Sequence, residues 1–252
     1  MSCGRSSKKK EQHLTPLEKL AGEYGDRWVW TAFAPVCKAF VAVVAGRRTL
    51  HFAKRLVAAV QVAVVGIPLF VSDQLRHYTT ALLRAYGKKI PVPRPAGKRG
   101  RKPNPKLQPP PELQYAQVVK RYRKNRVVSV TTRVIFGCAE AIQARLAAGP
   151  VSRTINTAFV ERSNATLRHH NSRLARKRYT FAKKADPFDQ HLWFLIAYYH
   201  FVRPHHSLRQ SQEQPGPRCW SPRTPAMAAG KTDHVWSLYE LLTFRVPEGG
   251  DA

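Results

Sequence analysis

A proline-rich basic segment near the middle of the chain limits what the polypeptide can fold into. Positions 88–112 read KKIPVPRPAGKRGRKPNPKLQPPPE and hold eight prolines, eight Lys or Arg and one acid. Proline has no backbone N–H to donate, so this segment cannot form a helix or a central strand. We therefore expect an exposed basic insertion or linker that interrupts the folded part of the chain.

Apolar patterns before this segment predict an α/β fold. Runs rich in β-branched and aromatic residues indicate strands, and a helical apolar periodicity indicates helices. The order strand, strand, helix, strand, helix favours a mixed sheet with helices packed on it. The predicted strands are Arg27–Phe33, Ala39–Ala45 and Ile67–Ser72, and the predicted helices run from a cap at Thr49 to about Val65 and over 74–86.

Beyond the proline-rich segment the chain is predicted to be mainly helical. Residues 113–127 fit either a strand or a helix. We expect helices over Ala139–Ala147, Thr157 to about Arg178 and Phe188–Phe201, and a last apolar element over Val235–Phe244. The aromatic side chains of the third helix, Trp193, Phe194, Tyr198 and Tyr199, are expected in the core.

The charge of the chain favours a polyanionic partner. Of 252 residues, 43 are Lys or Arg and 15 are Asp or Glu, which gives a formal net charge of +28 at pH 7. Such an excess disfavours an ordinary metabolic enzyme for small neutral substrates. Nucleic acid is the simplest partner, and an anionic membrane surface is the weaker alternative.

The sequence predicts a cytoplasmic, nucleoid-associated protein without a membrane span. The four cysteines are far apart and form no C-x-x-C pair, which suits a reducing compartment. The N-terminal segment lacks the apolar stretch of a secretory signal. The apolar run Leu56–Val71 is interrupted by Gln61 and Pro68 and is shorter than the roughly 20 residues that a span needs.

Acidic residues are scarce, so candidate metal ligands are few. Between Asp26 and Glu161 the only acidic residues are Asp73, Glu112 and Glu140. Asp73 follows a predicted buried strand, where functional groups of open α/β sheets often lie. The residue fits equally well as an N-cap of the next helix or as a metal ligand.

Glu161 lies in the basic block FVERSNATLRHHNSRLARKR. The simpler interpretation is a glutamate in the first helical turn, where it interacts favourably with the helix dipole. Glu161 also shares one helix face with Asn164, Arg168 and Asn171. A lone acid among cations fits a carboxylate that holds a metal while the cations hold phosphates. The predicted DNA contacts in this block are Arg162, Asn164, Arg168, Arg176, Lys177 and Arg178.

Two further motifs allow alternative interpretations. Arg99 and Arg101 lie in an Arg-Gly-Arg segment that fits a narrow minor groove, or else a solvated loop that touches phosphates. His200, His205 and His206 suggest a metal site, but their position at the end of an aromatic helix favours packing and phosphate contacts over zinc.

Several segments together resemble insertion-sequence-one-type DDE transposases. The matching strings are GDRWVWTAF, VAGRRT, FVSDQLRHY, NTAFVERSNATLRHHNSRLARKRYTFAKK, AYYHFVRPHHSLR and TPAMAAGKTDHVWSLYELL, which cover most of residues 20–245. The combination of FVERSNATLR with YYHFVRPHHSLR is specific.

This resemblance implies a ribonuclease-H-like fold and Mg²⁺-dependent cleavage and strand transfer of double-stranded DNA, with Mn²⁺ as an alternative ion. It implies a homo-oligomer on transposon ends and target DNA. The family's second aspartate falls on Asp73 and its glutamate falls on Glu161, so both are expected to be catalytic and to bind metal. The implied catalytic domain comprises 26–87 and 113–202, between a basic segment 1–25 and a C-terminal extension 203–252.

The family's first aspartate has no counterpart at the matching position. Family members carry it in a D-E-x-W-S/G-F/Y segment ahead of a K-K run, whereas Met1–Lys10 contains no acid. We expect the first strand and its aspartate to be missing, although Asp26 is a candidate replacement. Severely reduced activity is expected because two acids hold two Mg²⁺ ions poorly. A non-catalytic DNA-binding remnant is the main alternative, and an RNA-binding basic protein is a weaker one.

Overall fold

The computed structural model describes residues 3–6, 13, 15–17, 27–93, 103–174, 185–211 and 219–245. The chain divides into two compact units. The first contains Arg27–Ala32 and Val41–Asn164, and the second contains Phe33–Phe40 and the chain from Ala165 onwards. Among the described residues, none of the helices combines the length and the apolar character needed to cross a bilayer.

The first unit contains a mixed three-stranded sheet in the order β4-β7-β8. Strand β4 (Phe70–Asp73) is parallel to β7 (Tyr115–Arg123), which is antiparallel to β8 (Arg126–Phe136). Helices α3 (Arg76–Tyr86) and α4 (Ala139–Ala148) follow β4 and β8 along the chain. The predicted α/β class and the predicted helix at α4 are confirmed.

A second three-stranded sheet has the order β1-β2-β3. Strands β2 (Arg27–Ala34) and β3 (Ala39–Gly46) confirm two predicted strands, and Lys38 closes their connection with a φ of 54°. A strand also precedes them, because β1 (Cys3–Ser6) pairs beside β2. The expectation that this strand is missing is therefore wrong, although the sequence CGRS brings no carboxylate to the sheet.

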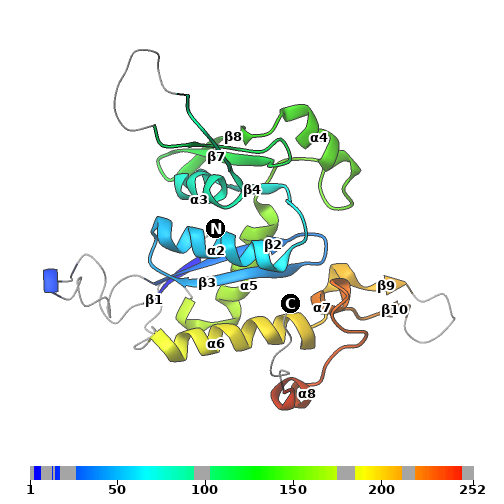
Figure 1. Ribbon diagram of the computed structural model, residues 1–252. Helices are drawn as coiled ribbons and strands as arrows, with labels where there is room; N and C mark the ends of the chain where they lie inside the picture. Colours follow the sequence, from blue (N-terminus) through cyan, green and yellow to red (C-terminus); the bar gives the residue numbers. More distant parts are fainter. Residues whose placement is uncertain are drawn as a thin grey trace. The chain divides into compact units, whose positions relative to one another are not determined.

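The core of the first unit forms where α2 (Leu50–Ala63) and α3 pack against each other (Figure 1). Thr49 lies at the predicted N-cap position of α2 but makes no side-chain cap hydrogen bond. Trp30 is fully buried, donates its indole N–H to the Arg47 carbonyl at 3.2 Å, and meets the Tyr78 ring edge-on at 5.8 Å. Apolar burial of this size is the main stabilising contribution to such a core. The buried cluster comprises Trp30, Ala42, Ala53, Leu56, Val57, Val60, Tyr78, Ala81, Leu82 and Tyr115.

The proline-rich segment is bracketed by two short strands that pair only with each other. Strands β5 (Lys88–Ile90) and β6 (Lys106–Gln108) are antiparallel. They belong to neither three-stranded sheet, which agrees with the prediction that proline keeps this segment out of a central strand.

In the second unit, helix α6 (Ala185–Ala197) continues into a π-helical turn, η3 (Tyr198–Val202). Tyr199 is buried and donates its hydroxyl to the Lys38 carbonyl at 2.8 Å. Trp193 and Phe194, by contrast, are 55% and 43% exposed, so their predicted core position is wrong. The buried face of α6 carries Phe188, Leu192, Leu195 and Ile196 instead. The remaining short elements are η2 (Ser172–Leu174), η4 (His206–Leu208), β9 (Gln210–Ser211), β10 (Trp220–Ser221), α7 (Pro225–Ala228) and α8 (Leu238–Thr243).

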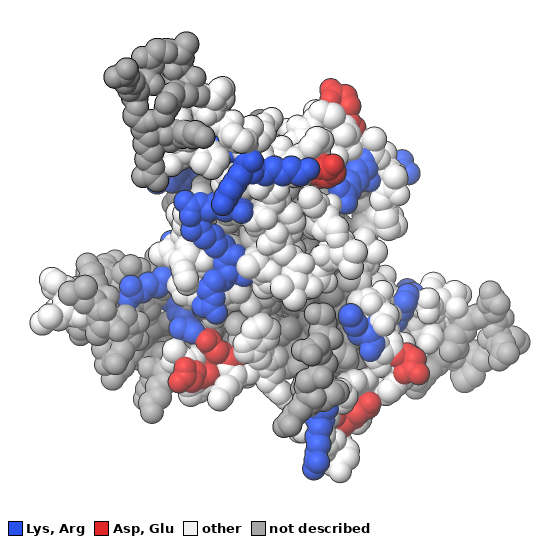
Figure 2. Space-filling view, viewed as in Figure 1, with Lys and Arg blue, Asp and Glu red and all other residues white. Residues whose placement is uncertain are grey.

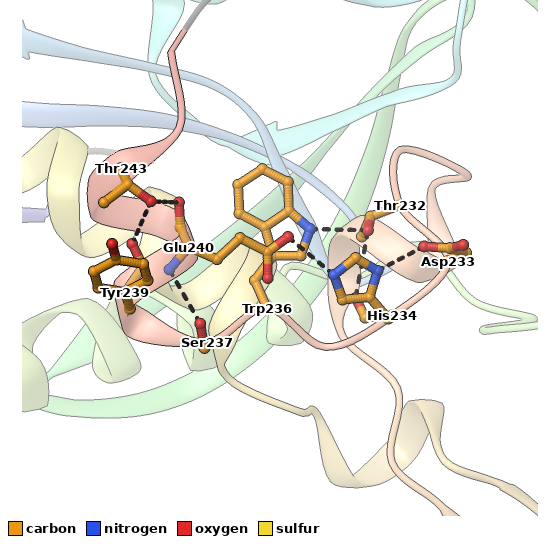
Figure 3. Close-up of polar contacts among 8 residues, drawn as sticks. All are labelled: Thr232, Asp233, His234, Trp236, Ser237, Tyr239, Glu240 and Thr243. Carbon is orange, nitrogen blue, oxygen red and sulfur yellow. Dashed lines mark hydrogen bonds and ion pairs between the residues drawn. The ribbon is translucent and has the colours of Figure 1, made fainter.

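Helix α8 starts in a polar network centred on His234 (Figure 3). The two ring nitrogens of His234 contact Asp233 at 2.6 Å and Glu240 at 2.9 Å. Hydrogen bonds to Asp233 and then to Glu240 raise the pKa of His234 above its usual value. Ser237 completes the cap by accepting from the Glu240 amide at 3.0 Å. These acids therefore serve a local structural role.

Candidate functional site

A pocket of about 300 Å³ in the first unit brings together the two acids singled out by the sequence. Asp73 and Glu161 both line it, whereas Glu112 and Glu140 do not. Two cations, Arg48 and Lys120, line it as well. The remaining lining residues are Gln74, Leu75, Val118, Tyr122 and Thr157.

Asp73 is the last residue of β4 and lies opposite Val118 of β7. The alternative in which Asp73 caps the next helix is wrong, because the N-cap of α3 is Leu75. Within the described part of the chain, the Asp73 Oδ1 atom is buried and has no hydrogen-bond partner. A buried carboxylate oxygen without a donor is energetically costly, which makes Asp73 a candidate position for a bound water or ligand.

Two tyrosines, Tyr78 and Tyr115, interact with the end of β4 that carries Asp73. Burial, and then the negative charge of Asp73, raises the pKa of Tyr78 well above its ordinary value, so the hydroxyl stays protonated. The Tyr115 hydroxyl lies 2.8 Å from the Ser72 hydroxyl and accepts a hydrogen bond from the Gln117 amide at 2.8 Å. These contacts join the side chain of Ser72, the neighbour of Asp73 on β4, to two side chains of β7.

Glu161 enters the pocket from the first turn of α5 (Ala158–His170). Its Oε1 atom accepts hydrogen bonds from Lys120 at 2.5 Å and from the Thr157 hydroxyl at 2.8 Å. Desolvation alone would raise the pKa of Glu161. The bonds from Lys120 and Thr157 and the charge of Lys120 outweigh desolvation and hold the pKa below its ordinary value. Glu161 is therefore ionised and paired at neutral pH.

Lys120 is a pocket residue that the sequence did not predict. It lies on β7 two residues after Val118, so alternation along the strand places both on one face. The sequence shows only that Lys120 ends the run AQVVK. It gives no sign that this lysine contacts Glu161, which is 41 residues away.

Asp73 and Glu161 are the acids in the pocket that could hold a metal ion. Among the described residues, no group of three His, Cys, Asp or Glu side chains is arranged to hold a metal. Asp73 offers an unpaired oxygen, whereas Glu161 is paired with Lys120. Mg²⁺ commonly binds through one or two carboxylates together with water and substrate phosphates, so two acids are the least that such a site would need for two protein ligands.

Helix α5 is shorter than predicted. It ends at His170, because the Asn171 side-chain oxygen accepts a hydrogen bond from the Arg173 amide and starts the separate turn η2. Arg162 is exposed, as a DNA contact requires. Asn164 is only 2% exposed and accepts a hydrogen bond from the Thr31 hydroxyl at 3.1 Å, which contradicts its predicted contact with DNA.

Arg168 is half-buried, and its Nε atom lacks a hydrogen-bond partner within the described part of the chain. The other predicted contacts, together with the candidate Asp26, lie outside the described residues: Arg99, Arg101, Arg176, Lys177 and Arg178.

His200 packs rather than binding a ligand. Its Nε2 atom accepts a hydrogen bond from the Phe40 amide at 2.9 Å, and burial lowers the pKa of His200 to about 4. His205 lies at the N-cap of η4, where its ring nitrogen accepts from the Ser207 amide, and His206 contacts Arg209.

The surface has the basic character that the composition indicates. On the face drawn in Figure 2, Lys and Arg side chains cover more of the surface than Asp and Glu side chains. Comparison with known protein families, curated proteins and solved structures gives no match.

Proposed function

We propose that this chain acts on DNA as a DDE-transposase-type enzyme, in which Asp73 and Glu161 hold Mg²⁺, or Mn²⁺, against a phosphate. The observation that supports this proposal best is the buried, unpaired Oδ1 atom of Asp73 in a pocket that Glu161 shares. An ion bound there would satisfy that oxygen and offset the cost of its burial.

The other pocket residues suit a phosphodiester substrate. Arg48 and Lys120 supply positive charge beside the two acids, so a phosphate can approach without net repulsion. A bound magnesium ion would polarise a phosphoryl oxygen and stabilise developing negative charge. Tyr78 stays a neutral phenol next to Asp73, so it adds no competing negative charge.

The proposal includes severely reduced activity. Phosphoryl transfer in this class relies on three acids and two metal ions, whereas the pocket offers two acids, and one of them is paired with Lys120. Lys120 and Thr157 both bond the Oε1 atom of Glu161, so a metal ion would have to share the carboxylate with the Lys120 ammonium.

The same ion pair supports the second candidate, a non-catalytic DNA-binding remnant. A lysine ammonium 2.5 Å from Glu161 neutralises the carboxylate without any metal. In this alternative the basic surface still binds DNA, and Asp73 is a vestige of a metal site.

The deciding experiment measures metal binding and DNA cleavage on the same protein. Residues 1–252 would be titrated with Mg²⁺ and Mn²⁺ by calorimetry and incubated with labelled duplex oligonucleotides. Asp73→Asn keeps the shape of the side chain and removes its charge. We expect this change to abolish metal binding and to lower the residual cleavage roughly 100-fold, the scale on which losing one electrostatic stabiliser slows a reaction.

Glu140→Gln is the matched control, because Glu140 is an exposed acid of the same unit outside the pocket. DNA binding without metal binding, with Asp73→Asn indistinguishable from wild type, would establish the non-catalytic alternative. Cleavage and joining at the rates of an intact transposase would disprove the predicted loss of activity.

A further inference from the structure

A two-stranded basic ribbon extends beyond the edge of the β4-β7-β8 sheet. Strand β4 pairs with β7 only as far as Val118, and the rest of β7 is paired with β8 alone. We call residues 119–131 the basic ribbon; its register runs from Val119 opposite Thr131 to Arg123 opposite Arg126.

The end of the basic ribbon is a tight turn. Lys124 and Asn125 both have left-handed backbone conformations, with φ values of 48° and 62°. Two consecutive left-handed residues form the type I′ turn whose twist matches a right-handed pair of strands. The arginines that flank the turn are therefore held at a defined spacing.

The basic ribbon combines positive charge with exposed apolar surface. It carries five cations and no acid, namely Lys120, Arg121, Arg123, Lys124 and Arg126. Tyr122 and Val128 are 65% and 63% exposed, and Val127 and Val130 are also exposed. An edge strand with exposed β-branched residues favours association, so this surface indicates a partner.

Charge complementarity identifies duplex DNA as that partner. The major groove of B-form DNA is about 12 Å wide and admits a two-stranded β-ribbon. Five residues of strand reach roughly 17 Å, enough to cross the groove. Arginine can contact guanine edges or phosphates there, and valine can contact thymine methyl groups. The major groove of A-form RNA is too narrow for side chains to read, which disfavours duplex RNA.

The base of the basic ribbon belongs to the pocket. Lys120 and Tyr122, which alternate along β7, line the pocket together with Asp73 and Glu161. We infer that the basic ribbon enters the major groove of duplex DNA and thereby sets where the phosphate backbone lies over the pocket. This inference rests on the proposed function, because it specifies how the same site receives its DNA.

The test removes two charges from the end of the ribbon. Arg123→Ala with Arg126→Ala would be compared with Lys88→Ala with Lys89→Ala, which removes two exposed charges from β5 of the same unit. Affinity for a fluorescent duplex would be measured by anisotropy over a range of NaCl concentrations in EDTA. We expect the ribbon variant to bind at least tenfold more weakly at physiological salt. Its salt slope should decrease by about 0.9 for each lost phosphate contact, and the β5 variant should change less.

A second measurement tests whether the protein occupies the major groove. Wild-type protein should protect guanine N7, which faces the major groove, from dimethyl sulfate, and the ribbon variant should lose that protection. Thermal melting of both double variants checks that the exposed substitutions leave the fold intact. Equal affinity and equal salt slope for the two variants would overturn the inference.

The competing occupant is a second copy of the chain paired along β8. If Val128→Lys converts a dimer into a monomer and leaves DNA affinity unchanged, the surface is a protein interface and the inference is wrong. The outcome is separable from that of the proposed function. Loss of DNA affinity in the ribbon variant supports the inference even if Asp73→Asn shows that the pocket binds no metal.

Discussion

At the scale of single residues, Lys120 controls the state of the pocket. Its bond to Glu161 is on the surface, with the two side chains 30% and 40% exposed, so it contributes at most about 1 kcal/mol to stability. The same bond and the charge of Lys120 help to hold the pKa of Glu161 below its ordinary value.

We predict that Lys120→Met raises the pKa of Glu161, because desolvation remains after the compensating bond and charge are removed. The change should also strengthen Mg²⁺ binding, since the Lys120 ammonium no longer competes with the metal ion for the Glu161 carboxylate. Titration of the Glu161 side-chain carbon by NMR measures the pKa, and calorimetry measures the metal. Lys89→Met, at an exposed position of β5, is the control, and an unchanged Glu161 pKa in the Lys120 variant would contradict the prediction.

The sequence predicted the two acids but not their cation. Asp73 and Glu161 could be found because acids are scarce and because one of them follows a buried strand. Lys120 could not be found, since the chain is rich in lysine and only the tertiary fold shows which lysine meets which acid.

At the scale of secondary-structure elements, a buried hydrogen bond fixes α5 relative to β2. The Thr31 hydroxyl donates to the Asn164 oxygen across 133 residues of sequence, and both side chains are buried. This contact joins the second turn of α5, three residues beyond Glu161, to β2.

We expect Asn164→Ala to lower the free energy of unfolding by about 1–3 kcal/mol, because it leaves the buried Thr31 hydroxyl without this acceptor. Urea denaturation measures the loss. A double-mutant cycle with Thr31→Val isolates the pair and should give a coupling of about 0.5–1.5 kcal/mol. Strictly additive effects would show that the bond does not couple the two elements.

Helices and strands that bury one face could be predicted from the sequence. Strand β8, which is mostly exposed, could not. Strands β2 and β3 and helix α2 lie where their apolar patterns predict. Most of β8 is exposed, so burial imposes no alternation on its sequence and leaves no periodic signal. The end of α5 was also missed, because Asn171 ends the helix through a side-chain bond that hydrophobic periodicity does not report.

At the scale of the whole molecule, acid should destabilise the fold through His200. Burial lowers the pKa of His200 to about 4 in the folded chain, whereas an unfolded histidine titrates near its ordinary value of 6.5. The unfolded state therefore takes up the proton first as the pH falls. The stabilisation is fully present above about pH 6.5, declines towards pH 4, and amounts to roughly 3 kcal/mol.

His200→Gln tests this contribution, because glutamine can accept the Phe40 amide bond but does not titrate. Melting temperatures of both proteins between pH 7 and pH 4 should show a steeper fall for the wild type. Parallel curves would exclude His200 as the acid-sensitive group. The comparison cancels the contribution of His234, whose raised pKa works in the opposite direction and weakens stability as the pH rises.

Four of the described elements belong to both compact units, because the division of the chain passes through β1, β2, β3 and α5. Expressing either unit alone would require cutting strands within their hydrogen-bonded length and cutting α5 between its second and third turns. Each fragment would expose backbone groups that the intact chain satisfies internally. Dissection of this protein by truncation would therefore report the damage at the cut ends, and point substitutions are the informative tool.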